Sequence, residues 1–406
     1  MDIRSVVCYN CDFNAKDTIE GVVRIVKNFT LESAGRQSHY DHLLIMIVLL
    51  LTGAGIVALY SASYSFAELF YSGDKWHFVS RQLILAAFGF VFLVIIARLK
   101  IETLRAMIMP IVLAAIVLCL LTFVPGIGIK LNGAARWIRI GDWTFQPSEL
   151  VKLILPVYLA HIFDKKQDKL DSFAVGVLPP TLITALFFTL IYQQNNFSTA
   201  LFVAVNALFI FFLAGVRMKY FISATVILIP ISFLLVLTKE HRLKRLISYI
   251  FPDWEPQGAG YQVHSSIITI ASGGFWGKGL GQGVRKVRSV PEIQSDFIFA
   301  SYAEESGFIG VILFILLFAA FAWRAYAIAL RQNTIFKKLL VFGLVNTIVS
   351  QALLNIAVVS GAVPATGVPL PFFSAGGSSL AVTLIACGFL INVSKDSLGA
   401  DIANER

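Results

Sequence analysis

Asp296 is the residue best placed for acid–base chemistry. It lies in the segment PEIQSDF (residues 291–297), where a long polar stretch gives way to an apolar run that begins at Ile298. A carboxylate at such a boundary loses part of its hydration, and this makes it a stronger base. An Asp directly before an apolar run is equally typical of a helix N-cap. The local sequence therefore leaves a general base and a helix cap as equal alternatives.

A second charged group precedes the apolar run that begins near residue 148. Pro147 suits the first turn of a helix, where its missing N–H group would have no partner. Glu149 complements the helix dipole there, and Lys152 follows three residues later on the same face. Glu149 and Lys152 are either a structural ion pair or, with Gln146, part of a polar cavity for a charged headgroup. We favour the cavity, because ionisable residues inside membrane spans are usually functional.

Basic side chains in two extramembrane segments could bind an anion such as phosphate. One segment carries Arg136, and the other, residues 239–302, is rich in Lys and Arg and includes the candidates Arg285 and Lys286. Residues 273–283 are dense in glycine, but no strand precedes them and they show no Walker pattern, which argues against a nucleotide site. Cys8 and Cys11 form a C-x-x-C pair without two further ligands nearby, so we predict no metal site.

The elements that position these residues are membrane helices. The chain is 57% hydrophobic and only 14% charged, far from the composition of a soluble protein. Continuous apolar runs of this length are typical of helices rather than of barrel strands. We therefore predict an all-α integral membrane protein with ten spans, near residues 43–63, 79–98, 105–124, 148–163, 177–193, 198–216, 220–238, 303–323, 339–360 and 379–394.

The distribution of Lys and Arg predicts the topology. The short, densely basic connections alternate so that they lie on one side of the membrane, which the positive-inside rule makes the cytoplasm. Both termini are then cytoplasmic, and the long loops 125–147, 239–302 and 361–378 are extracytoplasmic. We predict an N-terminal extension over 1–41, a membrane domain over 42–395 and a tail over 396–406. No cleavable signal peptide is expected. The net charge of +9 comes without a soluble basic domain, which argues against nucleic-acid binding.

Four segments in order resemble the SEDS family (shape, elongation, division and sporulation proteins). They are listed here as they stand in the sequence: GAARW (133–137), QPSELVK (146–152), PEIQSDFIFASYAEESG (291–307) and PFFSAGGSS (371–379). The resemblance covers residues 43–394. Within the family the chain is most similar to the FtsW branch, rather than to RodA, through YSAS (60–63), HFVSRQ (77–82), FLAG (212–215) and GAGYQ (258–262).

The resemblance implies a peptidoglycan glycosyltransferase that polymerises lipid II. Asp296 is then the catalytic base that activates the acceptor hydroxyl, and undecaprenyl pyrophosphate leaves. Positive charge must stabilise this leaving group, with Arg136 and Lys152 as first candidates and Arg285 and Lys286 next. A divalent cation is a possible cofactor, although no carboxylate cluster is spaced to hold one.

The resemblance also implies partners and a location. The expected partners are a class B penicillin-binding protein, in contact with residues 303–360, and other divisome proteins at the septal inner membrane. One family carboxylate is replaced by Asn196, which puts the role of that acid in doubt. The alternatives are a lipid II flippase, which would need an acid near the midplane of the bilayer, a RodA-type elongation polymerase, and a non-catalytic scaffold.

Overall fold

A computed structural model of the chain describes residues 40–71, 73–131, 133–251, 259–283 and 294–404. Each predicted span coincides with one long helix in the described part of the chain. These helices are α2 (His42–Phe70), α3 (His77–Arg98), α5 (Ile108–Leu121), α6 (Pro147–Lys165), α7 (Leu178–Gln193), α8 (Phe197–Leu213), α9 (Met218–Leu237), α13 (Ile298–Leu330), α14 (Ile335–Val359) and α15 (Gly377–Asn404).

In the described part of the chain, seven candidate spans are long and apolar enough to cross a membrane. Among the other long helices, α5 and α8 are apolar but shorter, with 14 and 17 residues, and α6 carries four charged side chains. The chain is therefore a multi-pass membrane protein, and the count of ten spans stays a prediction. The short helix α4 (Ile101–Ala106) precedes α5, and the one-turn helices η1 (Gln167–Lys169) and η2 (Phe173–Val177) follow α6.

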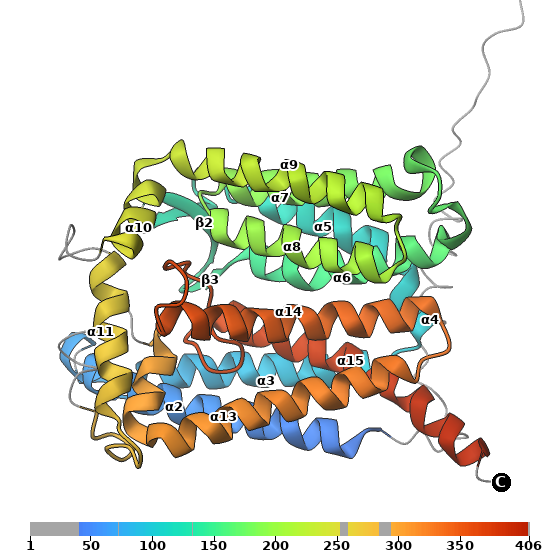
Figure 1. Cartoon of the computed structure of the whole chain (residues 1–406). Helices are drawn as coiled ribbons and strands as arrows, with labels where there is room; N and C mark the ends of the chain where they lie inside the picture. The colour runs from blue at the N-terminus through green and yellow to red at the C-terminus, as the bar shows by residue number, and fades with distance from the viewer. Residues whose placement is uncertain (1–39, 72, 132, 252–258, 284–293, 405–406) are drawn as a thin grey trace, which may run out of the picture.

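The long helices run side by side in one bundle (Figure 1). Contacts between α6 and α14 join the group α5–α9 to the group of α2, α3, α13 and α15. The closest packing is between α3 and α15. An added Cβ at Gly89 would touch Leu384, and one at Gly388 would touch the backbone of Leu93, so these glycines let the two helices approach closely.

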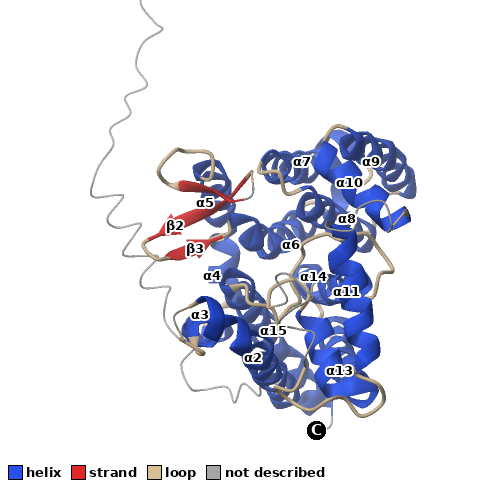
Figure 2. Ribbon diagram, turned by 90° about the vertical axis from the view of Figure 1, so that its left-hand side faces the viewer, coloured by secondary structure: helices blue, strands red, loops and turns tan. Residues whose placement is uncertain are grey.

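One end of the bundle carries additional structure that the sequence did not predict in full. Residues 128–145 form an antiparallel sheet of three strands, β1 (Gly128–Leu131), β2 (Ala134–Ile140) and β3 (Trp143–Phe145). The all-α prediction missed this sheet because its strands are short. The helices α10 (Glu240–Ile250) and α11 (Ala259–Ser272) cross the same end. Figure 2 shows the sheet on one side of this end and α10 and α11 on the other.

The beginning of α2 and the end of α15 lie together at the opposite end of the bundle (Figure 1). The location of both termini on the cytoplasmic side of the membrane stays a prediction. α15 continues to Asn404, so residues 396–404 of the expected tail prolong this helix. The extension 1–39, with Cys8 and Cys11, lies outside the described residues.

Candidate active site at the sheet-bearing end of the bundle

Asp296 lies in a turn (residues 294–297) immediately before α13. The N-cap position of this helix is occupied by Phe297, so Asp296 is not the cap that the sequence offered as an alternative. The Asp296 side chain is partly exposed. The capping alternative is therefore wrong, and a catalytic role for this carboxylate stays a prediction.

The backbone around Asp296 is bound to the loop between α14 and α15. The Asn355 side chain donates hydrogen bonds to the carbonyl oxygens of Asp296, at 2.8 Å, and Val368, at 2.9 Å. The N–H group of Ala375 donates to the carbonyl oxygen of Gln294 at 2.8 Å. A Cβ atom added to Gly367 would lie 3.4 Å from Oδ2 of Asp296, so this loop passes directly beside the carboxylate.

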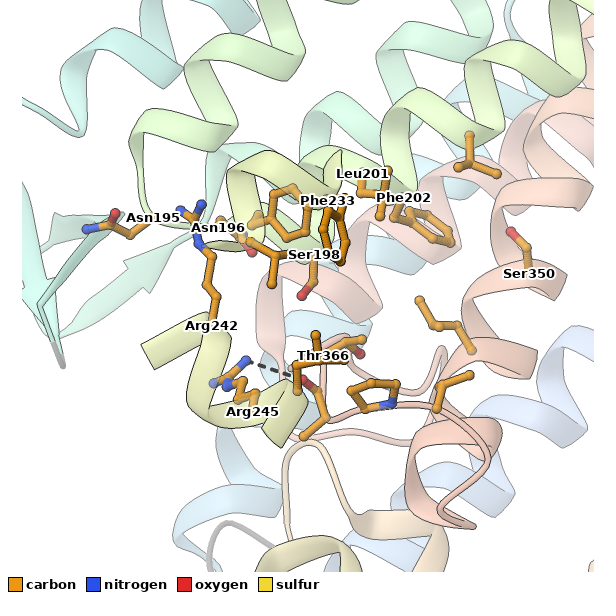
Figure 3. A pocket seen from close by; sticks show the side chains of 18 of the residues that line it. Asn195, Asn196, Ser198, Leu201, Phe202, Phe233, Arg242, Arg245, Ser350 and Thr366 are labelled. Atoms are coloured by element: carbon orange, nitrogen blue, oxygen red, sulfur yellow. Dashed lines mark hydrogen bonds between the residues drawn. The ribbon is translucent and has the colours of Figure 1, made fainter. Parts of the chain in front are cut away.

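A cavity of about 550 Å³ lies next to this loop, between α8, α9, α10 and α14. Its wall toward α8 and α9 is apolar, and it includes Leu201, Phe202 and Phe233 (Figure 3). The side chains of Val205 and Phe233 are 53% and 60% exposed, so the cavity opens onto the apolar outer surface of the bundle. The opposite end of the cavity is polar, and Thr366 lies there beside Gly367.

Three arginines, which we call the arginine cluster, line the polar end of the cavity: Arg136 from β2, and Arg242 and Arg245 from α10. Arg242 is only 7% exposed and stacks on the rings of Tyr192 and Phe197, at 4.6 and 5.2 Å. Among the described residues, its Nε and Nη2 atoms are buried without a hydrogen-bond partner. A buried guanidinium with unused donors is costly unless an anion binds to it.

The other two members of the arginine cluster are bound to the backbone near the cavity. Arg136 donates a hydrogen bond to the carbonyl oxygen of Asn195, a residue whose positive φ of 60° is tolerated by asparagine. Arg245 donates to the carbonyl oxygen of Ala365 at 3.4 Å (Figure 3). These contacts hold the guanidinium groups at the border of the cavity.

The electrostatic environment of Arg136 is that of an anion site. Burial, together with the positive charges of Arg245 and Arg242, lowers the pKa of Arg136 to about 10, while Asp296 acts in the opposite direction. Among the described residues that line the cavity there is no carboxylate to neutralise the arginine cluster. The cavity therefore offers three positive charges to a ligand, next to the segment that carries Asp296.

Glu149 and Lys152 form the ion pair that their spacing predicted, at 2.8 Å, with both side chains 4% exposed. Nζ of Lys152 also donates to Oε1 of Gln351 at 2.7 Å, and Gln351 donates to the carbonyl oxygen of Pro369 at 2.8 Å. This chain of contacts joins α6 to α14 and to the loop beside Asp296. Neither charged residue is among those that line the 550 Å³ cavity, and a direct role in substrate binding stays a prediction.

Gln146 is at the N-cap of α6, where its backbone N–H donates to Oγ of Ser378 at 3.2 Å and its amide donates to Ser148 at 2.9 Å. It lies, like the ion pair, outside the set of residues that line the cavity. Arg285 and Lys286 lie outside the described residues. No group of three His, Cys, Asp or Glu side chains in the described part of the chain could hold a metal ion, and a role for a divalent cation stays a prediction.

Sequence reasoning did not select Arg242 or Arg245 as site residues, although both belong to the basic loop that it noted. Their spacing of three residues places them on one face of α10. That spacing could have singled them out. Asn196, which replaces the family carboxylate, is buried and lines the cavity next to the arginine cluster. Because an amide is neutral, Asn196 leaves the cavity without the negative charge that the carboxylate of the family pattern would add.

Comparison with known proteins identifies the family. The profile of the cell cycle protein family FtsW/RodA/SpoVE matches residues 41–398. The probable peptidoglycan glycosyltransferase FtsW of Geobacter sulfurreducens is 37% identical over 361 residues, which are 89% of this chain and 96% of that protein. The stage V sporulation protein E of Bacillus subtilis is also 37% identical, over 88% of this chain and 97% of its own length.

Solved structures agree with the sequence comparison. A chain from a peptidoglycan synthase complex that coordinates polymerization and crosslinking matches with a TM-score of 0.73 at 26% identity, over 88% of this chain and 98% of its own. The rod shape determining protein RodA of Thermus thermophilus matches with a TM-score of 0.64 at 26% identity, over 88% of this chain and 97% of its own. The chain therefore belongs to the FtsW/RodA/SpoVE family of cell cycle proteins, the SEDS family that its motifs resemble.

Proposed function

We propose that this protein is a peptidoglycan glycosyltransferase that polymerises lipid II, with Asp296 as the general base. The proposal rests on one cavity. It has an apolar wall that opens to the surface of the bundle and a polar end that the arginine cluster lines. It lies beside the loop that passes next to the Asp296 carboxylate. The names of relatives, which include probable peptidoglycan glycosyltransferases, support the same activity.

The cavity fits the three chemical parts of a polyprenyl-pyrophosphate-linked sugar. The apolar wall formed by α8 and α9 suits the first isoprene units of the lipid, which would enter from the exposed side at Phe233. The pyrophosphate would lie against the arginine cluster, where guanidinium groups match phosphate oxygens with paired N–H donors. The sugar would then extend past Thr366 and Gly367 toward Asp296.

The reaction is a single displacement at the anomeric carbon of the donor glycan. Asp296 takes the proton from the 4-hydroxyl of the acceptor GlcNAc, and the hydroxyl oxygen forms a bond to the anomeric carbon. The bond from that carbon to the pyrophosphate oxygen breaks, and undecaprenyl pyrophosphate leaves with its bonding electrons. The arginine cluster stabilises the charge that develops on this leaving group.

The cellular setting follows from the relatives. A class B penicillin-binding protein is the proposed partner, because a structural relative belongs to a complex that coordinates polymerization and crosslinking. The proposed contact lies on α13 and α14. α13 presents large apolar side chains, including Leu313, Leu316 and Trp323, which are 60%, 57% and 65% exposed. We also propose action at the division septum with other divisome proteins, which is in keeping with a family of cell cycle proteins.

The function is tested by polymerisation of lipid II. The full chain, purified with its penicillin-binding partner, is given lipid II, and glycan products are separated on a gel. Wild type is expected to form long strands, and Asp296→Ala is expected to form none while remaining folded. If both proteins form strands equally, the assignment of Asp296 is wrong. If neither forms strands but wild type moves lipid II across liposomes, the protein is a flippase.

A further inference from the structure

α13 is broken near its beginning, at Gly307. This residue has φ of 64° and ψ of −165°, which are not helical. The break separates a nine-residue segment (residues 298–306), which we call the α13 head, from the remainder of the helix. Because Asp296 lies two residues before the α13 head, the placement of this short segment determines where the carboxylate lies.

The backbone groups that the break leaves without helical partners bind to the glycine-rich turn (residues 273–283). The N–H groups of Lys278 and Gly279 donate to the carbonyl oxygens of Glu304 and Glu305, at 3.1 and 3.0 Å. Beyond the break, Phe308 and Ile309 donate to the carbonyl oxygens of residues 274 and 275, at 3.0 and 3.4 Å. The glycine-rich turn therefore replaces the helical hydrogen bonds on both sides of Gly307.

Glycine allows the two backbones to approach this closely. A Cβ atom at Gly277 would overlap the carbonyl oxygen of Glu305, and one at Gly307 would overlap the N–H group of Gly277. A Cβ atom at Gly273 would overlap the carbonyl oxygen of Ala303. The density of glycine in residues 273–283, which resembled a phosphate-binding loop in the sequence, has this packing against α13 as its physical reason.

Two buried carboxylates of the α13 head add side-chain contacts to the backbone contacts. Glu304, whose side chain is fully buried, forms an ion pair with Lys278 at 2.8 Å, and Oγ of Ser272 lies within hydrogen-bond distance of both. Oγ of Ser61 in α2 donates to Glu305 at 2.5 Å and accepts from the N–H group of Gly281 at 2.9 Å. The glycine-rich turn is thereby bound to α2 and to the α13 head.

We propose that Lys278 and Glu304 are positioning residues, which hold the α13 head so that the Asp296 carboxylate faces the acceptor hydroxyl. The inference rests on the proposed function, because it assigns these residues to the same reaction. Neither residue lines the 550 Å³ cavity, so neither contacts the lipid substrate in it. Asp296 is then held from two sides, by Asn355 through its carbonyl oxygen and by the glycine-rich turn through the α13 head.

The test compares Lys278→Met with Lys75→Met in the full chain with its partner. Lys75 is the matched control, because it forms an ion pair of similar length with Glu68, at 3.1 Å, in an exposed position between α2 and α3. Loss of the Lys278–Glu304 pair is expected to lower kcat about 10- to 100-fold, since a displacement of about 1 Å has this effect on a reaction. KM for lipid II is expected to stay within about twofold, because the cavity is unchanged.

Conservative variants and binding measurements separate positioning from a general structural role. Lys278→Arg keeps the ion pair and is expected to retain kcat within about threefold of wild type, and Glu304→Gln is expected to resemble Lys278→Met. Lys278→Met takes the cation away from the fully buried Glu304 carboxylate, so thermal unfolding is measured on every variant and rates are compared only among folded proteins. If Lys278→Met keeps wild-type kcat, or loses rate and lipid II binding together, the inference is wrong. Wild-type activity of Asp296→Ala would instead overturn the proposed function.

Discussion

Replacement of Arg242 with Met removes one guanidinium from the arginine cluster and keeps an apolar stem of similar length. The stem is needed because Arg242 packs on Tyr192 and Phe197, and the Met thioether forms favourable contacts with aromatic rings. Arg242 offers two buried donors, Nε and Nη2, which among the described residues have no partner. The substitution therefore removes two donors that a ligand can use, together with the hydrogen bond from Nη1 to the carbonyl oxygen of Leu235 at 3.0 Å.

The size of the expected loss in polymerisation rate follows from those two donors. A hydrogen bond to a charged group contributes about 1.5–3 kcal/mol, and Arg136 and Arg245 would compensate for part of a loss of two. We expect a loss of about 3 kcal/mol in transition-state stabilisation, which is roughly a 100-fold lower rate. Arg242→Lys keeps the charge without the paired donors, and its rate should lie between those of wild type and Arg242→Met.

The assay is the initial rate of glycan polymerisation, with thermal unfolding measured on the same preparations. The matched control is Lys244→Met on the same helix, since Lys244 is 55% exposed and pairs with Glu240 at 2.9 Å. The control should stay within about twofold of wild type, because exposed ion pairs contribute little. Arg242→Met should unfold at a temperature close to that of wild type, because loss of the hydrogen bond to Leu235 is offset by removal of two buried donors without a partner. A wild-type rate in Arg242→Met, or a lost rate with a much lower unfolding temperature, would refute the reasoning.

Two further predictions follow from buried contacts. Glu149→Gln or Lys152→Met alone leaves one charge buried and should destabilise the protein by about 3–5 kcal/mol. The double substitution should recover most of that loss, measured by thermal unfolding. Equal losses in all three variants would contradict a buried pair. Gly367→Ala should lower the polymerisation rate, because its new Cβ lies 3.4 Å from Oδ2 of Asp296. Gly215 has a similar positive φ and open space around it, so Gly215→Ala should show only the effect of backbone strain. Equal rates in the two variants would show that contact with Asp296 is unimportant.

The positions of the membrane helices could be predicted from the sequence, and the structure confirms them. An apolar run of about 20 residues has one stable form in a bilayer, so length and composition are sufficient evidence. The break at Gly307 was not predictable, because it lies inside the long run of α13 and depends on the glycine-rich turn that packs against it. The sheet at residues 128–145 was not predicted for the same reason, because the formation of short strands depends on their tertiary contacts.

The site was predictable only in part. The boundary position of Asp296 made it a candidate whose catalytic role stays a prediction, and the spacing of Glu149 and Lys152 along α6 predicted the ion pair that the structure confirms. The sequence could not show that Arg242 and Arg245 point into the cavity, because this depends on the direction in which α10 crosses the end of the bundle. It also could not place Arg136 near Asp296, which lies 160 positions later in the chain.

The central claim is that Asp296 performs chemistry on a lipid substrate that other residues bind. The most direct measurement is the polymerisation rate of Asp296→Asn together with its dissociation constant for lipid II, in the full chain with its partner. Asn has nearly the same size as Asp, but its amide cannot take the proton from the 4-hydroxyl group of the acceptor sugar as a carboxylate can. We predict that the rate falls at least about 1,000-fold while the dissociation constant stays within about threefold of wild type. A variant that polymerises at the wild-type rate, or one that no longer binds lipid II, would contradict the account.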